Sequence, residues 1–344
     1  MPLRIRAALT VAATTFVAAA CSDGDSPFDE SPTPSGTPFV LIGPPDDVPS
    51  GAAVATPVPT VEGETMAPAG ELVSLAWLAG SGAYPAVPVP FQTPQPDSAL
   101  RAAIEDAVAG QEGEFSVIVH HLGDGRYADI DPDHSYYAAS LFKAAVLLTA
   151  YQQRDDGTLD FAKEVEITEE AAEHDLGTLE YLELEIGDKV TIGDAVKAMI
   201  VVSDTTLANL VLQEVGGNAV DATLRAAGAS TMSVTTRDLP ATAGDMAALF
   251  QAIATGAGVT NASRVEMLTY LSQEWFWSGV VAGIPSGTPF VHKSGAFTDA
   301  THDVAIVEGP SGPYLIAVLS DTSAEWEPIA AVSAAVWQYF ASNP

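Results

Sequence analysis

Apolar residues follow regular periods only in the second part of this 344-residue chain, from about residue 97 onward. Residues 100–108 have the spacing of an amphipathic helix, and residues 115–121 form an apolar, β-branched run that predicts a strand. The glycines at 123–125 predict a hairpin turn, with a returning strand at 126–130. A further helix is expected over residues 140–152.

A long, mostly helical block follows at residues 167–286, and strand patterns return after it. Helices are predicted within the block at 195–202, 207–215, 220–227 and 243–255, with an irregular loop at 230–241. Strands are predicted at 290–296, 302–308 and 314–319, and a closing helix at 324–341. Two β segments that flank a helical block predict an α+β fold. We expect one antiparallel sheet of about five strands, flanked by the terminal helices, with an inserted all-helical lobe at about 140–286 and a site between the two lobes.

The N-terminus has the features of an export signal. Arg4 and Arg6 precede an apolar stretch at 7–20, which ends in small residues directly before Cys21. This arrangement resembles a bacterial lipoprotein signal peptide over residues 1–20, with lipidation at Cys21. The protein would then be extracytoplasmic and anchored by lipid to the bacterial cell membrane. An ordinary signal peptide followed by a chance cysteine is the alternative.

Residues 21–96 read as a flexible, acidic tether. Residues 22–96 contain fifteen prolines and neither lysine nor arginine. Such proline-rich sequence favours extended chain over regular structure. A short apolar patch at 72–78 is expected to dock on the domain or to form a brief helix. The globular domain is therefore assigned to residues 97–344.

Composition excludes several classes of function. The net charge is −32, from 45 acidic and 13 basic residues, so the surface should repel nucleic acid. Cys21 is the single cysteine, and the six histidines show no metal-ligand spacing, so we expect neither a metal nor a cofactor. We expect a monomer. An anionic ligand would need a local cation against this unfavourable overall charge.

The first chemical motif is Ser140-x-x-Lys143. Positions three apart share one face of a helix, with side chains about 5–6 Å apart. A desolvated, neutral lysine amine could take the serine proton, and the N-terminus of the helix would favour negative charge forming there. Taken alone, the same spacing also fits a helix-capping serine followed by a solvated lysine.

Two further segments change that interpretation. Ser203-Asp204-Thr205 follows a predicted helix, and the run 293–295, Lys-Ser-Gly, lies on a predicted strand. Taken singly, Asp204 could be a helix cap and the lysine could end an exposed strand. Together with the first motif, their order and placement resemble the S-x-x-K, S-D-N and K-T-G set of class A β-lactamases and penicillin-binding proteins.

The resemblance covers about residues 97–342. The run 203–210 is similar to the family's S-D-N-T-x-A-N-L sequence, and 283–287 is similar to its G-[IL]-P-x-G approach to the strand. It implies a serine β-lactamase-like fold and a hydrolase acting on amide bonds. It also implies that Asn209 buttresses the helical lobe.

The resemblance assigns a role to each catalytic candidate. Ser140 would be the nucleophile that attacks an amide carbonyl, and Lys143 would be its base if burial lowers its pKa. Ser203 would relay a proton to the leaving nitrogen. Lys293 would supply the missing cationic spot and favour the neutral form of Lys143.

The remaining candidates would bind substrate. Ser294 would hydrogen-bond a substrate carboxylate drawn in by Lys293, and the backbone N–H of Ala296 would form an oxyanion hole with that of the nucleophile. Thr205 stands where the family usually has asparagine, and a threonine cannot offer both an amide donor and an acceptor. His302 stands where many class A enzymes carry an arginine, and it could bind carboxylate only when protonated. A strand-start histidine that points to solvent is the alternative.

A larger departure concerns the loop before residue 243. In class A β-lactamases an Ω-shaped loop carries a glutamate that activates the deacylating water. Here the corresponding loop, residues 233–242, is much shorter and contains no glutamate. Asp238 is the one local acid that could substitute. It could equally form a surface salt link with Arg237, or a turn.

The sequence therefore predicts a serine hydrolase of class A β-lactamase type, which opens the β-lactam amide through an acyl-enzyme on Ser140. Because the loop lacks glutamate, a peptidoglycan D-Ala-D-Ala carboxypeptidase or endopeptidase, or a penicillin-binding protein with slow turnover, is the alternative. A non-catalytic cell-wall binding module is a third. The expected partners are a small β-lactam or a peptidoglycan stem peptide, and the membrane through the N-terminal lipid.

Overall fold

The computed structural model describes residues 91–344. The predicted signal peptide, Cys21, the apolar patch at 72–78 and all but the last residues of the predicted tether lie outside the described residues. Among the residues that are described, no helix is both long enough and apolar enough to cross a membrane.

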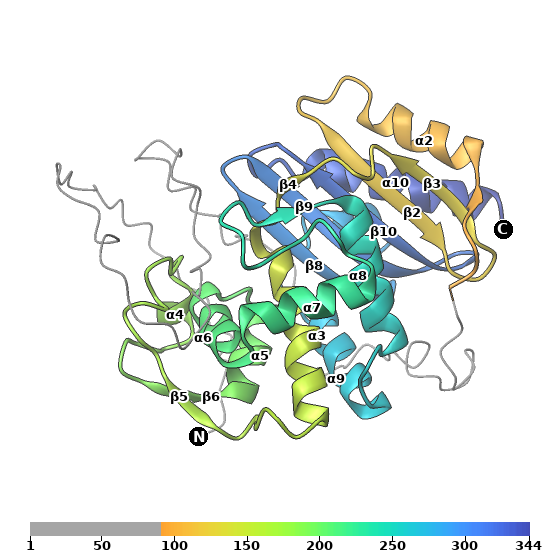
Figure 1. Ribbon diagram of the computed structural model, residues 1–344. Helices are drawn as coiled ribbons and strands as arrows, with labels where there is room; N and C mark the ends of the chain where they lie inside the picture. The colour runs from red at the N-terminus through yellow and green to blue at the C-terminus, as the bar shows by residue number, and fades with distance from the viewer. Residues whose placement is uncertain (1–90) are drawn as a thin grey trace.

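A six-stranded sheet forms one layer of the molecule (Figure 1). Its strand order is β1-β3-β2-β10-β9-β8, and every neighbouring pair is antiparallel except β1 with β3. The strands are β1 (Gln95–Pro96), β2 (Phe115–His121), β3 (Arg126–Ile130), β8 (Phe290–Phe297), β9 (Ala300–Gly309) and β10 (Gly312–Ser320). The two β segments of the sequence thus join into one sheet, as predicted, and the short parallel β1 is an addition.

Both faces of this sheet are covered, which explains why β2, β8, β9 and β10 are buried along most of their length. The terminal helices α2 (Ser98–Val108) and α10 (Glu327–Ser342) pack on one face, where Val117 and Val119 of β2 point. Ile118, between those two valines, points to the other face and into the core of the helical lobe. Figure 1 shows α2 and α10 on the side of the sheet away from this lobe.

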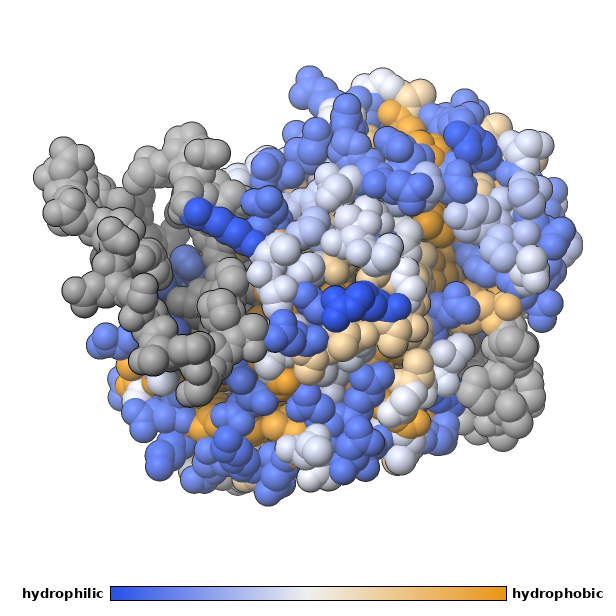
Figure 2. All heavy atoms as spheres, in the orientation of Figure 1, coloured by the Kyte–Doolittle hydropathy of each residue, from blue (hydrophilic) through white to orange (hydrophobic). Residues whose placement is uncertain are grey.

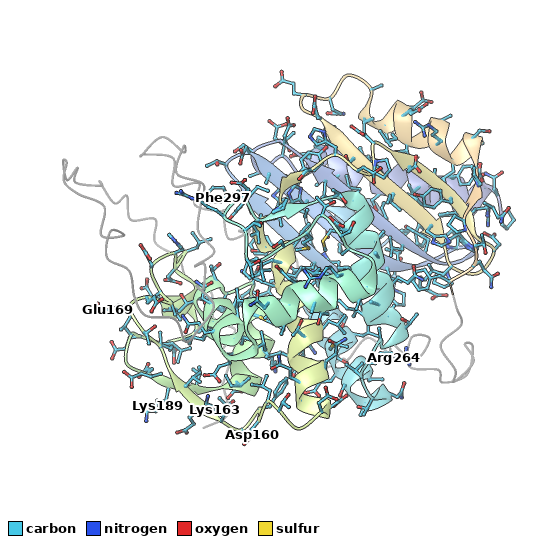
Figure 3. All side chains as sticks on the ribbon, in the orientation of Figure 1. Asp160, Lys163, Glu169, Lys189, Arg264 and Phe297 are labelled. Carbon is cyan, nitrogen blue, oxygen red and sulfur yellow. The ribbon has the colours of Figure 1, made fainter. Side chains whose placement is uncertain are left out.

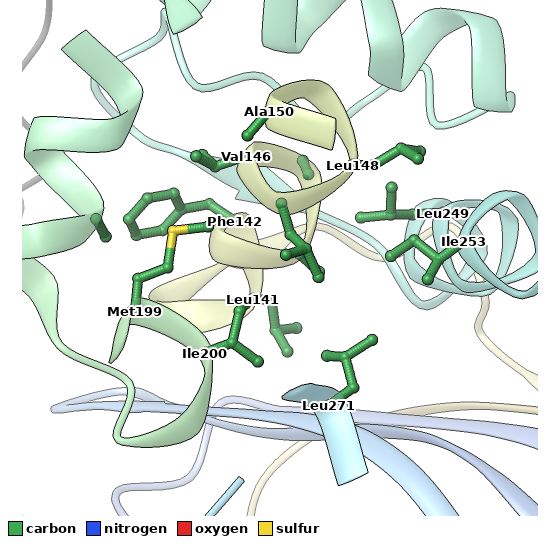
Figure 4. Packing of buried hydrophobic residues seen from close by; sticks show 14 of the residues in the cluster. Leu141, Phe142, Val146, Leu148, Ala150, Met199, Ile200, Leu249, Ile253 and Leu271 are labelled. Carbon is green, nitrogen blue, oxygen red and sulfur yellow. The ribbon is translucent and has the colours of Figure 1, made fainter. Parts of the chain in front are cut away.

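The helical lobe is built around α3, whose residues 142–151 are all buried. In Figure 4, Phe142 of α3 lies beside Met199, and Leu148 lies on the side that faces Leu249 and Ile253. The helices of the lobe are α3 (Phe142–Asp155), α4 (Thr178–Tyr181), α5 (Ile192–Val201), α6 (Thr205–Val215), α7 (Gly217–Ala227), α8 (Ala243–Thr255) and α9 (Asn261–Ser272). Because residues 142–151 of α3 are buried on every side, the surrounding helices and the sheet enclose this part of the helix.

Two short antiparallel pairs complete the fold. β5 (Glu164–Glu166) pairs with β6 (Lys189–Thr191) at the rim of the lobe, close to the labelled Lys163 and Lys189 in Figure 3. β4 (Tyr136–Tyr137) pairs with β7 (Pro240–Ala241), which lies at the end of the predicted irregular loop. The second pair matters for the site because it ties that loop to the segment that precedes Ser140.

Polar side chains cover most of the face shown in Figure 2, and apolar residues gather on the helical lobe below them. The large apolar side chains that are exposed among the described residues are Leu176, Tyr181, Ile186 and Trp277. Three of these four belong to the segment around α4 that leads to α5.

The packing around α3 predicts a large cost for removing a side chain from it. Leu147 is 0% exposed, and its truncation to alanine should lower the free energy of unfolding by about 2–5 kcal/mol, because a cavity remains in a closely packed core. Leu176 is 66% exposed, so the same truncation there should change stability by less than about 0.5 kcal/mol. Urea unfolding followed by circular dichroism measures both. Equal effects of the two substitutions would contradict the position assigned to α3.

Candidate active site

Ser140 sits in a short 3₁₀ turn, η1 (Ala139–Leu141), which leads directly into α3. The predicted helix thus begins with a tighter turn than expected and extends three residues further, to Asp155. Lys143 falls in the first turn of α3, and its Nζ lies 3.0 Å from Ser140 Oγ. The spacing of the motif therefore brings the two side chains into hydrogen-bond contact.

The Lys143 amine is surrounded by oxygen atoms from a second segment. Its Nζ lies 2.5 Å from the carbonyl oxygen of Ser203, 3.3 Å from Ser203 Oγ and 3.1 Å from Thr205 Oγ1. The side chain is 0% exposed, and none of its hydrogen-bond partners is a carboxylate. Such a site suits a neutral amine, which has two N–H donors and a lone pair that can accept the Ser140 proton.

The surroundings lower the pKa of Lys143 to about 7. Burial is the main cause, and the positive charge of Lys293 acts in the same direction, while Asp204 and Glu274 act in the opposite direction. A lysine with this pKa is partly unprotonated near neutral pH, which general-base catalysis requires.

Ser203-Asp204-Thr205 combines a structural and a chemical part. Asp204 is buried and caps α6, accepting from the Leu207 N–H at 2.6 Å and from Thr178 Oγ1 at 2.5 Å. Burial also raises the pKa of Asp204. The helix-cap interpretation of Asp204 is thus correct. The residues on either side of this cap, Ser203 and Thr205, are the ones that contact Lys143, and Thr205 uses its hydroxyl there.

The third motif lies on the edge strand β8, and its glycine brings the strand against the serine turn. A Cβ atom placed on Gly295 would lie 3.2 Å from both Ser140 N and the carbonyl oxygen of Ala138. A side chain at this position would therefore crowd the turn that carries the nucleophile. Ala296 is the next residue along β8, so the two N–H groups expected in the oxyanion hole come from neighbouring segments.

The Lys293 ammonium has a partner that the sequence did not predict. Glu274, which follows α9, accepts a hydrogen bond from Lys293 Nζ. Its oxygens also accept from Ser294 Oγ at 2.6 Å and from the Ser294 N–H at 2.9 Å. Glu274, Lys293 and the neighbouring His292 are each 0% exposed. The sequence does carry a weak signal for this contact, since an acidic residue beside the aromatic run 275–277 must find a partner if it is buried.

His292 lies between the carboxylate of Glu274 and that of Asp303. Its Nδ1 lies 3.0 Å from Asp303 Oδ1, and its Nε2 is 3.7 Å from Glu274. Although burial opposes the charged form, the carboxylates of Asp303 and Glu274 raise the pKa of His292 above its ordinary value. Asp303 also accepts from the Val280 N–H at 2.8 Å. Four ionisable side chains are thus packed together behind the edge strand.

His302 does not take the expected place. Its ring is 0% exposed, with Nε2 at 2.8 Å from the Tyr137 carbonyl oxygen and Nδ1 accepting from the Ser320 N–H at 3.2 Å. Burial lowers the pKa of His302 to about 4. A neutral ring whose two nitrogens are both hydrogen-bonded inside the protein cannot bind a carboxylate. We therefore remove His302 from the candidate site. Nor does it point to solvent, the alternative considered for a strand-start histidine.

Asn209 is buried in the helical lobe, whereas Asp238 is exposed on the loop beside the serine turn. The Asn209 side chain is buried, and its amide donates to the Ala171 carbonyl at 3.1 Å, as expected for a buttress. Asp238 is exposed at the surface, next to Leu239, whose carbonyl oxygen accepts from the Ala138 N–H at 2.8 Å. The loop that carries Asp238 therefore runs beside the serine turn, while the carboxylate itself lies in solvent.

Comparison with known proteins decides the family. Residues 99–340 match the model of the Beta-lactamase enzyme family. The chain belongs to this family. The predicted family and the serine β-lactamase-like fold are confirmed, and the family supports a serine hydrolase that acts on amide bonds.

Solved structures of this family share the fold. PBP-A is 20% identical, with a TM-score of 0.68 over 73% of this chain and 99% of its own; a mutant of it has been solved as an acyl-enzyme complex with penicillin G. A β-lactamase from Sphaerobacter thermophilus is 23% identical, with a TM-score of 0.61 over 70% of this chain and 96% of its own. A class A β-lactamase representing the last common ancestor of Gram-negative bacteria is 24% identical, with a TM-score of 0.63 over 70% and 99%. A search of curated proteins returned no match.

The pKa of Lys143 predicts how acylation should depend on pH. If the neutral amine is the base, the second-order rate constant for acylation should rise with pH along a limb centred at about 7. Asp204→Asn should move this limb to lower pH, since the Asp204 carboxylate favours the charged amine, and asparagine can still cap α6. Stopped-flow measurement with a chromogenic cephalosporin between pH 5 and 10 tests both. A limb near 10 in the parent protein, the ordinary value for lysine, would mean that the Lys143 amine is charged at neutral pH and cannot serve as the base there.

Proposed function

We propose that this protein is a serine hydrolase of β-lactamase type, which opens the β-lactam amide through an acyl-enzyme on Ser140. The proposal rests on the contact of Ser140 Oγ with a buried, desolvated Lys143 amine at 3.0 Å. A serine hydroxyl is a weak nucleophile until a neighbouring base accepts its proton, and this amine is positioned and neutral enough to do so. The fold and family agree with this chemistry.

Acylation would proceed in two proton transfers. Ser140 Oγ attacks the carbonyl carbon as its proton passes to the Lys143 amine, and the oxyanion accepts from the N–H groups of Ser140 and Ala296. The carbon–nitrogen bond then breaks. The leaving nitrogen takes the proton of the Ser203 hydroxyl, which Lys143 replaces from its ammonium group, 3.3 Å away. An ester on Ser140 and a free amine remain.

Release requires a water molecule to attack this ester, and here a second candidate function has support. The loop beside the serine turn contains no glutamate, and the acid in it, Asp238, is exposed. A base that is free in solvent is poorly placed to hold a water molecule against an ester. A long-lived acyl-enzyme is therefore expected. This favours a penicillin-binding protein or D-Ala-D-Ala peptidase, in which the same serine is acylated and released slowly.

The first test is formation of the adduct. Intact-mass measurement after incubation with benzylpenicillin should show one added penicilloyl group on the parent protein and none on Ser140→Ala. The control is Ser311→Ala, which makes the same substitution in the turn between β9 and β10, far from the site, and which should still form the adduct. Ser294→Gly would not serve, because Ser294 belongs to the site. Adduct that persists in Ser140→Ala would refute the assignment of the nucleophile.

The lifetime of the adduct separates the two candidates. Turnover of a chromogenic cephalosporin within seconds would favour the β-lactamase, whereas an adduct that lasts minutes or longer, together with release of D-Ala from a stem peptide, would favour the peptidase. Because Asp238 is exposed, Asp238→Asn should change the adduct lifetime by less than twofold. A tenfold or longer lifetime in this variant would instead make Asp238 the deacylating base.

A further inference from the structure

We propose that Glu274 acts as a built-in carboxylate for the Lys293–Ser294 pair, so that the enzyme selects amides and lactams whose leaving nitrogen has an uncharged group beside it. Such a group would be an ester, a primary amide or a hydrocarbon, in place of the usual free carboxylate. A D-Ala-D-Ala carboxypeptidase, whose leaving D-Ala carries a free carboxylate, falls outside this class, so the inference narrows the peptidase candidate to substrates whose carboxylate is blocked. This inference rests on the proposed acylation of Ser140 and assigns its substrate class.

The contacts of Glu274 are those that a bound carboxylate would make. One oxygen accepts from Lys293 Nζ and from Ser294 Oγ, and the other accepts from the Ser294 N–H at 2.9 Å. A serine hydroxyl has one proton to donate, and here it is directed to Glu274 at 2.6 Å. The hydroxyl and ammonium that were expected to bind a substrate carboxylate are therefore already engaged by a side chain of the protein.

The local charge also fails to attract an anion. The group of buried ionisable side chains consists of Lys293, His292, Glu274 and Asp303, each 0% exposed. Each basic side chain of this group lies against a carboxylate, Lys293 against Glu274 and His292 against Asp303, and the carboxylates raise the pKa of His292. The chain as a whole carries a net charge of −32. A carboxylate arriving from solvent meets no excess of positive charge to offset the loss of its hydration.

Displacement of Glu274 by a substrate is unfavourable for the same reason. Its carboxylate is 0% exposed and bound on both oxygens, so an incoming anion would place two like charges together or force Glu274 out of its hydrogen bonds. An uncharged group next to the leaving nitrogen has no such conflict. It can lie beside the Lys293–Glu274 pair without breaking it.

Benzylpenicillin and its methyl ester make a matched pair of probes, because they differ only at this carboxylate. Second-order rate constants for acylation, followed by intact mass, should be at least as large for the ester as for the free acid in the parent protein. A tenfold preference of the parent protein for the free acid would overturn the inference without any variant being needed.

Glu274→Gln should release Lys293 for an anion. In this variant, the ratio of the acylation rate constant of the free acid to that of the ester should rise at least tenfold, a comparison that cancels any change in Lys143, whose pKa Glu274 raises. Glu325→Gln makes the same charge change at an exposed position and should alter neither rate. Thermal unfolding of each variant verifies that it is folded. A Glu274→Gln protein that is folded but keeps the parental ratio of the two rates would refute the role of Glu274.

A binding measurement keeps this inference separate from the proposed function. In the Ser140→Ala background no acyl-enzyme forms, and isothermal titration with benzylpenicillin reports carboxylate recognition alone. Adding Glu274→Gln to this background should tighten binding at least tenfold, and unchanged affinity would count against the inference. If the parent protein forms no adduct with either probe, the acylation mechanism fails, while this titration still decides whether Glu274 excludes the carboxylate.

Discussion

Burial of the Lys143 amine is the constraint on which the rest of the structure depends. Lys143 loses its proton near pH 7 mainly because it is desolvated, and desolvation requires a dry position that a helix alone cannot provide. Here α3 supplies it, because the sheet and the helices of the lobe enclose that helix on all sides. The Ser203 and Thr205 oxygens then satisfy the N–H groups without adding a carboxylate that would hold the amine charged. The packing of the core around α3 is thus also what lowers the pKa of Lys143.

The charge state of Lys143 also depends on a second buried lysine, Lys293. The charge of Lys293 helps to keep Lys143 neutral, but an unpaired buried ammonium is costly, and Glu274 offsets that cost. The same carboxylate raises the pKa of Lys143. Glu274 therefore has two opposing effects. It stabilises the buried Lys293, and it raises the pKa of Lys143, which must stay low if the amine is to act as a base at neutral pH.

Much of the fold could be predicted because local patterns are consistent with it. Five of the six strands of the sheet and the helices α2 and α6 follow from periodicity, and the three motifs follow from their resemblance to the family. His302 was misplaced because β9 is buried on both faces, so no alternation of polar and apolar residues reveals which way its ring points. Glu274 was missed because it belongs to no motif and meets Ser294 across 20 residues of chain. Contacts between elements of this kind are set by tertiary packing.

Backbone strain explains why the serine–lysine spacing alone could not establish the site. Ala139, Ser203 and Leu239 have φ angles of +45°, +56° and +38°, although none of them is glycine. Each such residue costs about 1–3 kcal/mol and persists only where surrounding contacts hold it. Ala139 precedes Ser140, Ser203 contacts the Lys143 amine, and Leu239 is held to the serine turn through the Ala138 N–H. The geometry of Ser140 and Lys143 is therefore imposed by contacts of the serine turn with two segments that are distant in the sequence, and four residues in isolation would not adopt it.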